Sequence, residues 1–191
     1  MWSLEHGVMY YRPHRKREVI MRKPLLVVLT ALLLLLSNNI VHSQTLEQVK
    51  KQHVEKVLSS PQGQQIKSSV KKHSEKYGVD ETLILAVIMT ESGFNPKAKS
   101  PCSASGLMQL IPTTFKARGV GNNIWDIDQN IEAGTKHLAG LIARHKGNIY
   151  LALASYNLGG AKVPVQGAVP KAAKPYVNKV YYHKAIIEGT I

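Results

Sequence analysis

Glu91 is the residue of this sequence best placed to act as a catalytic acid. It ends the apolar run 83–90 and is followed at once by Ser92–Pro96 (SGFNP), which cannot continue a helix. A carboxyl group at the end of a buried helix is partly desolvated, which raises its pKa and keeps its proton near neutral pH. A general acid needs that protonated state. The alternative is a glutamate at a helix end that points into water.

Helices are expected to supply nearly all of the framework around Glu91, because strand-like alternation is almost absent from the sequence. Asp80 is a suitable N-cap for the helix that ends near Glu91, and the apolar residues on all sides of this helix predict a central position. The segment 106–112 is expected to form a short strand or turn. Further helices are expected over 46–58, 66–77, 112–118, 148–156 and 175–187, and from a cap at Asp126 or Asp128 to Gly147.

The first 43 residues resemble an export signal rather than part of this domain. A basic stretch precedes the apolar run 25–36, and small residues then precede a cleavage site between Ser43 and Gln44. A run of 12 residues is short of the roughly 20 that a membrane span needs. We therefore expect an N-terminal extension and secretory signal peptide over 1–43, with Met21 as an alternative start. An amphipathic helical linker over 44–61 and the main domain over 62–191 follow.

The sequence is strongly basic and has one cysteine. Its net charge is +13, and removal of residues 1–43 takes away six of the 25 Lys and Arg residues and two of the 12 acids, which leaves +9. A basic exported protein is suited to an anionic polymer, and cell-wall glycan with carboxylate-bearing peptides fits export better than nucleic acid does. Cys102 cannot form an intrachain disulfide, and no nearby residues give a thiol-protease signature, so a structural role is expected.

Three motifs in order make the sequence similar to the soluble lytic transglycosylases. They are ESGFNP from Glu91, GLMQL from Gly106 and ASYNLG from Ala154, with Ser100 between the first two. The resemblance covers about residues 65–185. It implies a mainly α, lysozyme-like fold in a single compact helical domain. The fold is α+β only in the sense that a short β or turn segment lies near the active site. The implied activity is cleavage of peptidoglycan between N-acetylmuramic acid and N-acetylglucosamine.

The resemblance also implies roles for particular residues. Glu91 falls on the catalytic acid/base, Ser100 on the family's serine, Gln109 on the glutamine of its G-L-M-Q motif, and Tyr156 and Asn157 on its aromatic-amide pair. The last four are the expected substrate-binding residues. One departure lies within the motifs' connecting loop: Ser103 stands where the family usually has glycine, and its side chain is expected to narrow the loop.

A single carboxyl group is enough for the implied reaction. Protonated Glu91 donates to the glycosidic oxygen, and the resulting carboxylate then takes the proton of the muramic acid C6 hydroxyl, which attacks the anomeric carbon. The product is a 1,6-anhydro sugar. Because the substrate supplies the nucleophile, no cofactor and no metal are expected, and the histidines show no metal-binding spacing.

Two other functions remain open from the sequence. A hydrolytic lysozyme would need a second carboxylate, and the acids after Glu91 are few: Asp126, Asp128, Glu132 and Glu188. A non-catalytic murein-binding assembly module of a secretion system would need no proton donor.

For location and partners we expect an exported, periplasmic monomer that acts on glycan strands and not on nucleic acid. Recruitment by a type IV or similar envelope-spanning secretion or conjugation machine is a hypothesis.

Overall fold

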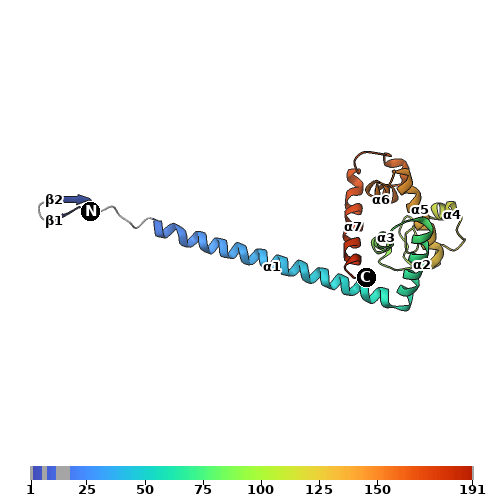
Figure 1. Ribbon diagram of the computed structural model, residues 1–191, viewed down its shortest axis with the longest axis horizontal. Helices are drawn as coiled ribbons and strands as arrows, with labels where there is room; N and C mark the ends of the chain where they lie inside the picture. Colours follow the sequence, from blue (N-terminus) through green and yellow to red (C-terminus); the bar gives the residue numbers. More distant parts are fainter. Residues whose placement is uncertain (1, 6–7, 12–17, 191) are drawn as a thin grey trace. The chain divides into compact units, whose positions relative to one another are not determined.

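The computed structural model describes the backbone of residues 2–5, 8–11 and 18–190, and the side chains of residues 27–37 and 44–190 (Figure 1). The chain divides into two compact units, Met1–Gln48 and Val49–Ile191. In the first unit, strands β1 (Trp2–Glu5) and β2 (Val8–Tyr11) form an antiparallel hairpin. Helix α1 (Glu18–Ser59) starts in the first unit and ends in the second.

The expected signal peptide coincides largely with residues whose side chains are not described. The predicted cleavage site at Ser43 lies among them, so the cleavage and the alternative start at Met21 stay predictions. Between Val27 and Leu36, where side chains are described, the large apolar residues of α1 are at least half exposed. Within the described part of the chain, no helix combines the length and the apolar character that a membrane crossing requires.

The second unit is built from helices, which confirms the predicted fold class. After α1 come α2 (Pro61–Tyr77), α3 (Glu81–Ser92), α4 (Pro112–Arg118), α5 (Ile127–Arg144), α6 (Ile149–Leu158), the 3-10 turns η1 (Gly160–Lys162) and η2 (Lys171–Ala173), and α7 (Lys174–Glu188). Figure 1 shows α3 between α7 and α2, and α3 packs against both of them.

Side-chain caps explain where α3 and α5 begin. Asp80 accepts a hydrogen bond from the Leu83 amide at the start of α3, which confirms the predicted cap. At the start of α5 the two predicted candidates are resolved, because Asp126 accepts from the Gln129 amide. A side-chain oxygen in this position satisfies an amide that would otherwise lack a partner at the helix N-terminus.

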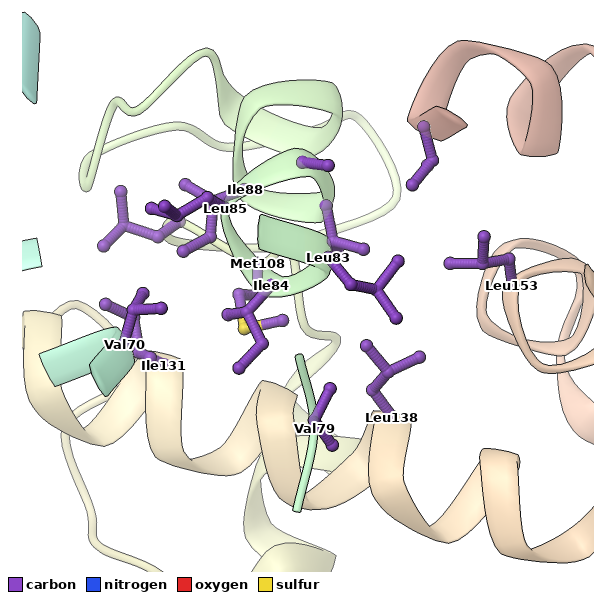
Figure 2. Packing of buried hydrophobic residues seen from close by; sticks show 14 of the residues in the cluster. Val70, Val79, Leu83, Ile84, Leu85, Ile88, Met108, Ile131, Leu138 and Leu153 are labelled. Carbon is purple, nitrogen blue, oxygen red and sulfur yellow. The ribbon is translucent and has the colours of Figure 1, made fainter. Parts of the chain in front are cut away.

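Helix α3 lies at the centre of the core, as its all-round apolar composition predicted. Its residues 83–88 are each at most 3% exposed. Figure 2 shows Leu83, Ile84, Leu85 and Ile88 surrounded by apolar side chains from other parts of the unit; the labelled neighbours are Val70, Val79, Met108, Ile131, Leu138 and Leu153. Burial of each large apolar side chain contributes roughly 1.5–3 kcal/mol, so α3 is a rigid support for the side chains of its last turn.

The compact unit begins upstream of the expected boundary near Gln62. Val54 and Leu58, on the last turns of α1, are 0% and 3% exposed and belong to the same core. The chain then bends sharply into α2, and Gly63 makes the bend possible: a Cβ atom there would lie 2.1 Å from the Val57 carbonyl oxygen. Residues 49–59 are therefore part of the packed unit.

Candidate active site

A cleft of about 690 Å³ opens beside the C-terminal end of α3. It is formed by the ends of α3 and α6, the loop before α4, and the middle of α5. All five residues predicted for the site line it, namely Glu91, Ser100, Gln109, Tyr156 and Asn157. The fold thus brings together side chains from three motifs that are far apart in the sequence.

Glu91 lies in the last turn of α3 and is half-buried. Gly93 ends the helix in the left-handed conformation (φ 59°) and its amide donates to the Met89 carbonyl. Burial raises the pKa of Glu91, while a hydrogen bond from Tyr176 and the charge of Lys179 oppose that shift without cancelling it. The direction agrees with the expectation from the sequence. A carboxyl group held in this way keeps its proton to higher pH than an exposed one.

Tyr176 is the direct partner of Glu91, and sequence reasoning missed it. Its hydroxyl donates to Glu91 Oε1 at 2.6 Å from the first turn of α7. Burial and the neighbouring Glu91 raise the pKa of Tyr176 well above its usual value, so the phenol stays protonated and remains a donor. The two residues are 85 positions apart, and no local pattern links them.

Hydrogen bonds to backbone groups fix the loop that carries Gln109. Gln109 has a positive φ of 44°, and its Nε2 donates to the carbonyls of Ala98 (2.8 Å) and Gly106 (2.9 Å). Isolated bridges pair Ser105 with Lys99 and with Leu110. This is the short β or turn segment that the fold prediction placed near the site. Because its amide N–H groups are used internally, Gln109 has its Oε1 to offer to a ligand.

Asn130, also missed in the sequence, fixes this loop to α5. Its side chain is 1% exposed; Oδ1 accepts from the Met108 amide at 2.8 Å, and Nδ2 donates to the carbonyls of Ser105 and Ile124. One turn later, Gly134 leaves room for Met108, whose Sδ would lie 2.2 Å from a Cβ at that position. One face of α5 therefore sets the position of the loop.

Tyr156 and His137 form the opposite wall of the cleft. The Tyr156 hydroxyl donates to the Met108 carbonyl at 2.9 Å, so it supports the loop rather than Glu91. Its ring lies 5.4 Å from that of His137, centroid to centroid. Burial, together with the charge of Arg118, lowers the pKa of His137 to about 4, which leaves the imidazole neutral near pH 7. His137 had not been expected at the site; it follows Gly134 by about one turn on the same face of α5.

Ser100, Ser103 and Cys102 belong to one turn at the rim. The Ser100 hydroxyl oxygen accepts from the Ala104 amide at 3.1 Å, which leaves its proton for another acceptor. Ser103 has a φ of 64°, a conformation that costs a residue with a side chain about 1–2 kcal/mol relative to glycine. A glycine at this position would adopt the same backbone conformation without that cost. Cys102 is exposed and lines the cleft.

A group of three side chains with metal-ligand chemistry lies outside the cleft, between α2 and α5. Ligand atoms of His73, Asp128 and Glu132 are within 4.8 Å of one another. Both carboxylates already have lysine partners, Lys72 at 2.9 Å from Asp128 and Lys76 at 2.6 Å from Glu132. These ion pairs account for the group as a contact that joins α2 to α5.

Comparison with known proteins agrees with the geometry of the cleft. Residues 68–177 match the Transglycosylase SLT domain. Among curated proteins, the membrane-bound lytic murein transglycosylases C of Serratia proteamaculans and Yersinia enterocolitica are each 40% identical over 111 residues, covering 49% of this chain and 31% of the relative. The chain thus spans about a third of the length of these relatives.

Solved structures show the same likeness. The lytic transglycosylase Slt of Pseudomonas aeruginosa and the 70 kDa soluble lytic transglycosylase of Escherichia coli each align with a TM-score of 0.57 and 25% identity. In both cases the alignment covers 62% of this chain and 23% of the other. Because the domain match extends over more than half of the sequence and includes every predicted site residue, the chain belongs to the Transglycosylase SLT domain family.

Proposed function

We propose that this protein is a peptidoglycan lytic transglycosylase. It would cleave the β-1,4 bond between N-acetylmuramic acid and N-acetylglucosamine and leave a 1,6-anhydromuramoyl end. Family membership supports the reaction class. The observation that carries the proposal is that Glu91 is the one carboxylic acid among the described residues that line the cleft.

One carboxyl group can serve both halves of this reaction. Protonated Glu91 donates to the glycosidic oxygen as the C1–O4 bond breaks and positive charge develops on the muramic acid ring. The Glu91 carboxylate then accepts the C6 hydroxyl proton while O6 bonds to C1, which restores the acid. The raised pKa of Glu91 favours the first step, and the Tyr176 hydrogen bond supports the carboxylate formed between the two steps.

The other residues of the cleft have positioning and binding roles in this proposal. Gln109 Oε1 and the exposed Asn157 amide are suited to N-acetyl and hydroxyl groups of the sugars, and Ser100 retains a hydroxyl proton for a similar contact. Tyr156 presents its ring as part of the wall while its hydroxyl holds the loop. His137 is neutral, so it adds a polar side chain to the cleft without adding a charge there.

Removal of the Tyr176 hydroxyl should change the pH dependence of the reaction. In Tyr176→Phe the Glu91 carboxylate loses a hydrogen bond that favours the charged form, so the pKa of Glu91 rises further. The activity lost on the alkaline side, as Glu91 deprotonates, then moves to higher pH. We also expect kcat/KM at the optimum to fall about tenfold, because a bond to a charged group contributes about 1.5–3 kcal/mol before water replaces part of it.

The measurement is a pH–rate profile of wild type and Tyr176→Phe on soluble glycan strands. Tyr150→Phe is a suitable control, because Tyr150 is an exposed tyrosine that stacks on Tyr181 and does not line the cleft. An unchanged alkaline limb in Tyr176→Phe would show that the hydroxyl does not act through Glu91.

Asp128 tests the alternative of a hydrolytic lysozyme. Burial opposes its ionisation, but hydrogen bonds from Lys72, Ser69 and His73 outweigh this and lower the pKa of Asp128 to about 2. Asp128→Asn should retain lytic activity, since Asp128 does not line the cleft. It should lower the free energy of unfolding near pH 7 by about 1 kcal/mol, a modest value because the side chain is 42% exposed and solvent screens the pairs.

The pH dependence of this stability difference has a defined sign. A carboxylate with a depressed pKa stabilises the fold above its unfolded pKa of about 4 and loses that contribution as the pH falls towards 2. Urea unfolding at several pH values should therefore show the wild-type advantage shrinking below about pH 4. Asp126→Asn, which alters only the α5 cap, is also expected to keep its activity. Loss of lysis in either folded variant would favour a second catalytic carboxylate.

Export to the periplasm and action as a monomer complete the proposal. The basic charge, the leader-like segment 1–43 and the wall-directed family are what support them. Local opening of the wall for an envelope-spanning secretion or conjugation machine is a proposal of the same kind, and the stretch of α1 from Leu46 to Leu58 is the segment we would test for docking.

Mass spectrometry of the products released from peptidoglycan sacculi tests the proposed reaction. Anhydro-muropeptides are expected from the wild-type protein. Products with reducing ends, heavier by one water, would identify a lysozyme instead. Binding to sacculi with no soluble product would identify a murein-binding module.

A further inference from the structure

A second cavity, separate from the cleft, lies where α1, α2 and the segment after α3 meet. Its volume is about 670 Å³, which is within the usual range for small-ligand sites. Lys56, Val57 and Ser60 line it from the end of α1 and the bend, Gln62 from the start of α2, and residues 93–97 from the segment that follows Glu91. Figure 1 shows the bend between α1 and α2, and Ser60 of this bend lines the cavity.

The lining of this cavity is cationic. Lys56 and Lys97 face it together with His53, and no aspartate or glutamate is among the described lining residues. Within the described part of the chain, neither lysine forms an ion pair, whereas Lys72, Lys76 and Lys184 all do. Two uncompensated ammonium groups beside the Gln62 and Asn95 amides are suited to a carboxylate.

The walls of the cavity are held in place by the fold. Gln62 Nε2 donates to the Phe94 carbonyl at 3.3 Å and so connects α2 to the segment after α3. Phe94 is 3% exposed and has a φ of 66°, which anchors that segment in the core. On the other side, the Ser60 hydroxyl caps α2 by accepting from the Gly63 amide. The lysines therefore project from fixed positions rather than from mobile loops.

The cavity is lined both by residues that precede the family match and by residues inside it. Residues 53–62 precede the family match, which begins at residue 68, whereas residues 93–97 lie inside it. Gly93, which lines the cavity, also ends α3 two residues after Glu91. A ligand in the cavity would thus contact the segment that leaves the catalytic helix as well as residues that precede the family match.

We propose that this cavity binds a carboxylate group of the peptide stems carried by peptidoglycan. The inference rests on the proposed function for its choice of ligand, because stem peptides are the carboxylate-bearing part of that polymer. The volume accommodates a short peptide, and the charge complements its carboxylates. The consequence is selectivity: strands that carry peptides bind more tightly than bare glycan, through contacts outside the cleft.

Binding measurements with two forms of the polymer test this proposal. The full chain with Glu91→Gln, which binds without turnover, would be titrated with soluble glycan strands that carry tetrapeptides and with the same strands after an amidase has removed the peptides. Addition of Lys56→Gln and Lys97→Gln should weaken binding of the peptide-bearing strands about tenfold, as expected for two partly exposed charge contacts, and leave bare strands unaffected. Lys67→Gln with Lys71→Gln, an equal change of charge on exposed residues of α2, is the matched control.

Each possible result decides the question. Equal weakening on both strand types, or equal weakening by the control pair, would mean general attraction between a basic surface and an acidic polymer and would overturn the proposal. Unchanged binding in the Lys56/Lys97 variant would overturn it as well. Conversion of bare strands to anhydro products by the wild-type chain tests the proposed reaction separately. If that reaction fails, titration of the free tetrapeptide into the wild type and the Lys56/Lys97 variant still decides the role of the cavity.

Discussion

Glu91→Gln is expected to abolish the release of anhydro-muropeptides, with a fall in kcat/KM of at least about 10³-fold. The size of the effect follows from the two roles of one carboxyl group, because glutamine can neither donate the proton to the leaving oxygen nor accept one from the C6 hydroxyl. Glutamine has nearly the same shape as glutamic acid and can still accept the hydrogen bond from Tyr176, so the fold should persist.

Two measurements on the same preparation test these expectations. Product analysis after incubation with sacculi tests the loss of activity, and a thermal melt tests whether the fold persists. Glu132→Gln is the matched control, since it makes the same chemical change at a carboxylate that pairs with Lys76 and does not line the cleft. Substantial lysis by a folded Glu91→Gln protein would remove Glu91 from the mechanism.

Asn130→Ala should cause the largest loss of stability, about 3 kcal/mol or more. The substitution leaves the Met108 amide and the Ile124 carbonyl without their partner, and each buried polar group left unsatisfied costs about 1–3 kcal/mol. The Ser105 carbonyl loses one of its two hydrogen bonds and keeps the one from the Leu110 amide. The loop that carries Gln109 would also lose its attachment to α5. We therefore expect activity to fall even at temperatures where the protein remains folded.

The neighbouring residue provides the control for Asn130. Gln129 Oε1 also accepts two backbone hydrogen bonds, from the Asn122 and Asn123 amides, but on the exposed surface where water can replace it. Gln129→Ala should cost about 1 kcal/mol or less and retain activity. Urea denaturation of both variants measures the difference. Similar, small losses in both would show that burial of the Asn130 network contributes little.

The sequence predicted the parts of this protein that depend on neighbouring residues. Asp80 and Asp126 cap their helices by contacts within three positions, and the all-apolar run before Glu91 is buried on every side because no face of it is polar. The raised pKa of Glu91 followed from the same local pattern. Such features are encoded within a few residues and can be read without knowing the tertiary structure.

Contacts between distant segments were not predictable in this way. Tyr176 meets Glu91 across 85 residues, and its position on α7 looked like that of an ordinary packed aromatic. Asn130 looked like any polar residue of a surface helix, although it is 1% exposed. The start of the packed unit at Val49 depends on Val54 and Leu58 reaching the core, which only the bend at Gly63 allows. The roles of Ser100, Gln109, Tyr156 and Asn157 stay predictions, although all four line the cleft.

The place of Glu91 in the last turn of α3 adds a contribution that no neighbouring side chain supplies. Aligned peptide dipoles give the C-terminal end of a helix a partial negative charge, which disfavours a carboxylate there by about 0.3–1 kcal/mol. This field acts in the same direction as burial and comes from the backbone alone. Substitutions that open the cleft to water should therefore remove only part of the tendency of Glu91 to hold its proton, because the helix that positions the acid also helps to keep it protonated.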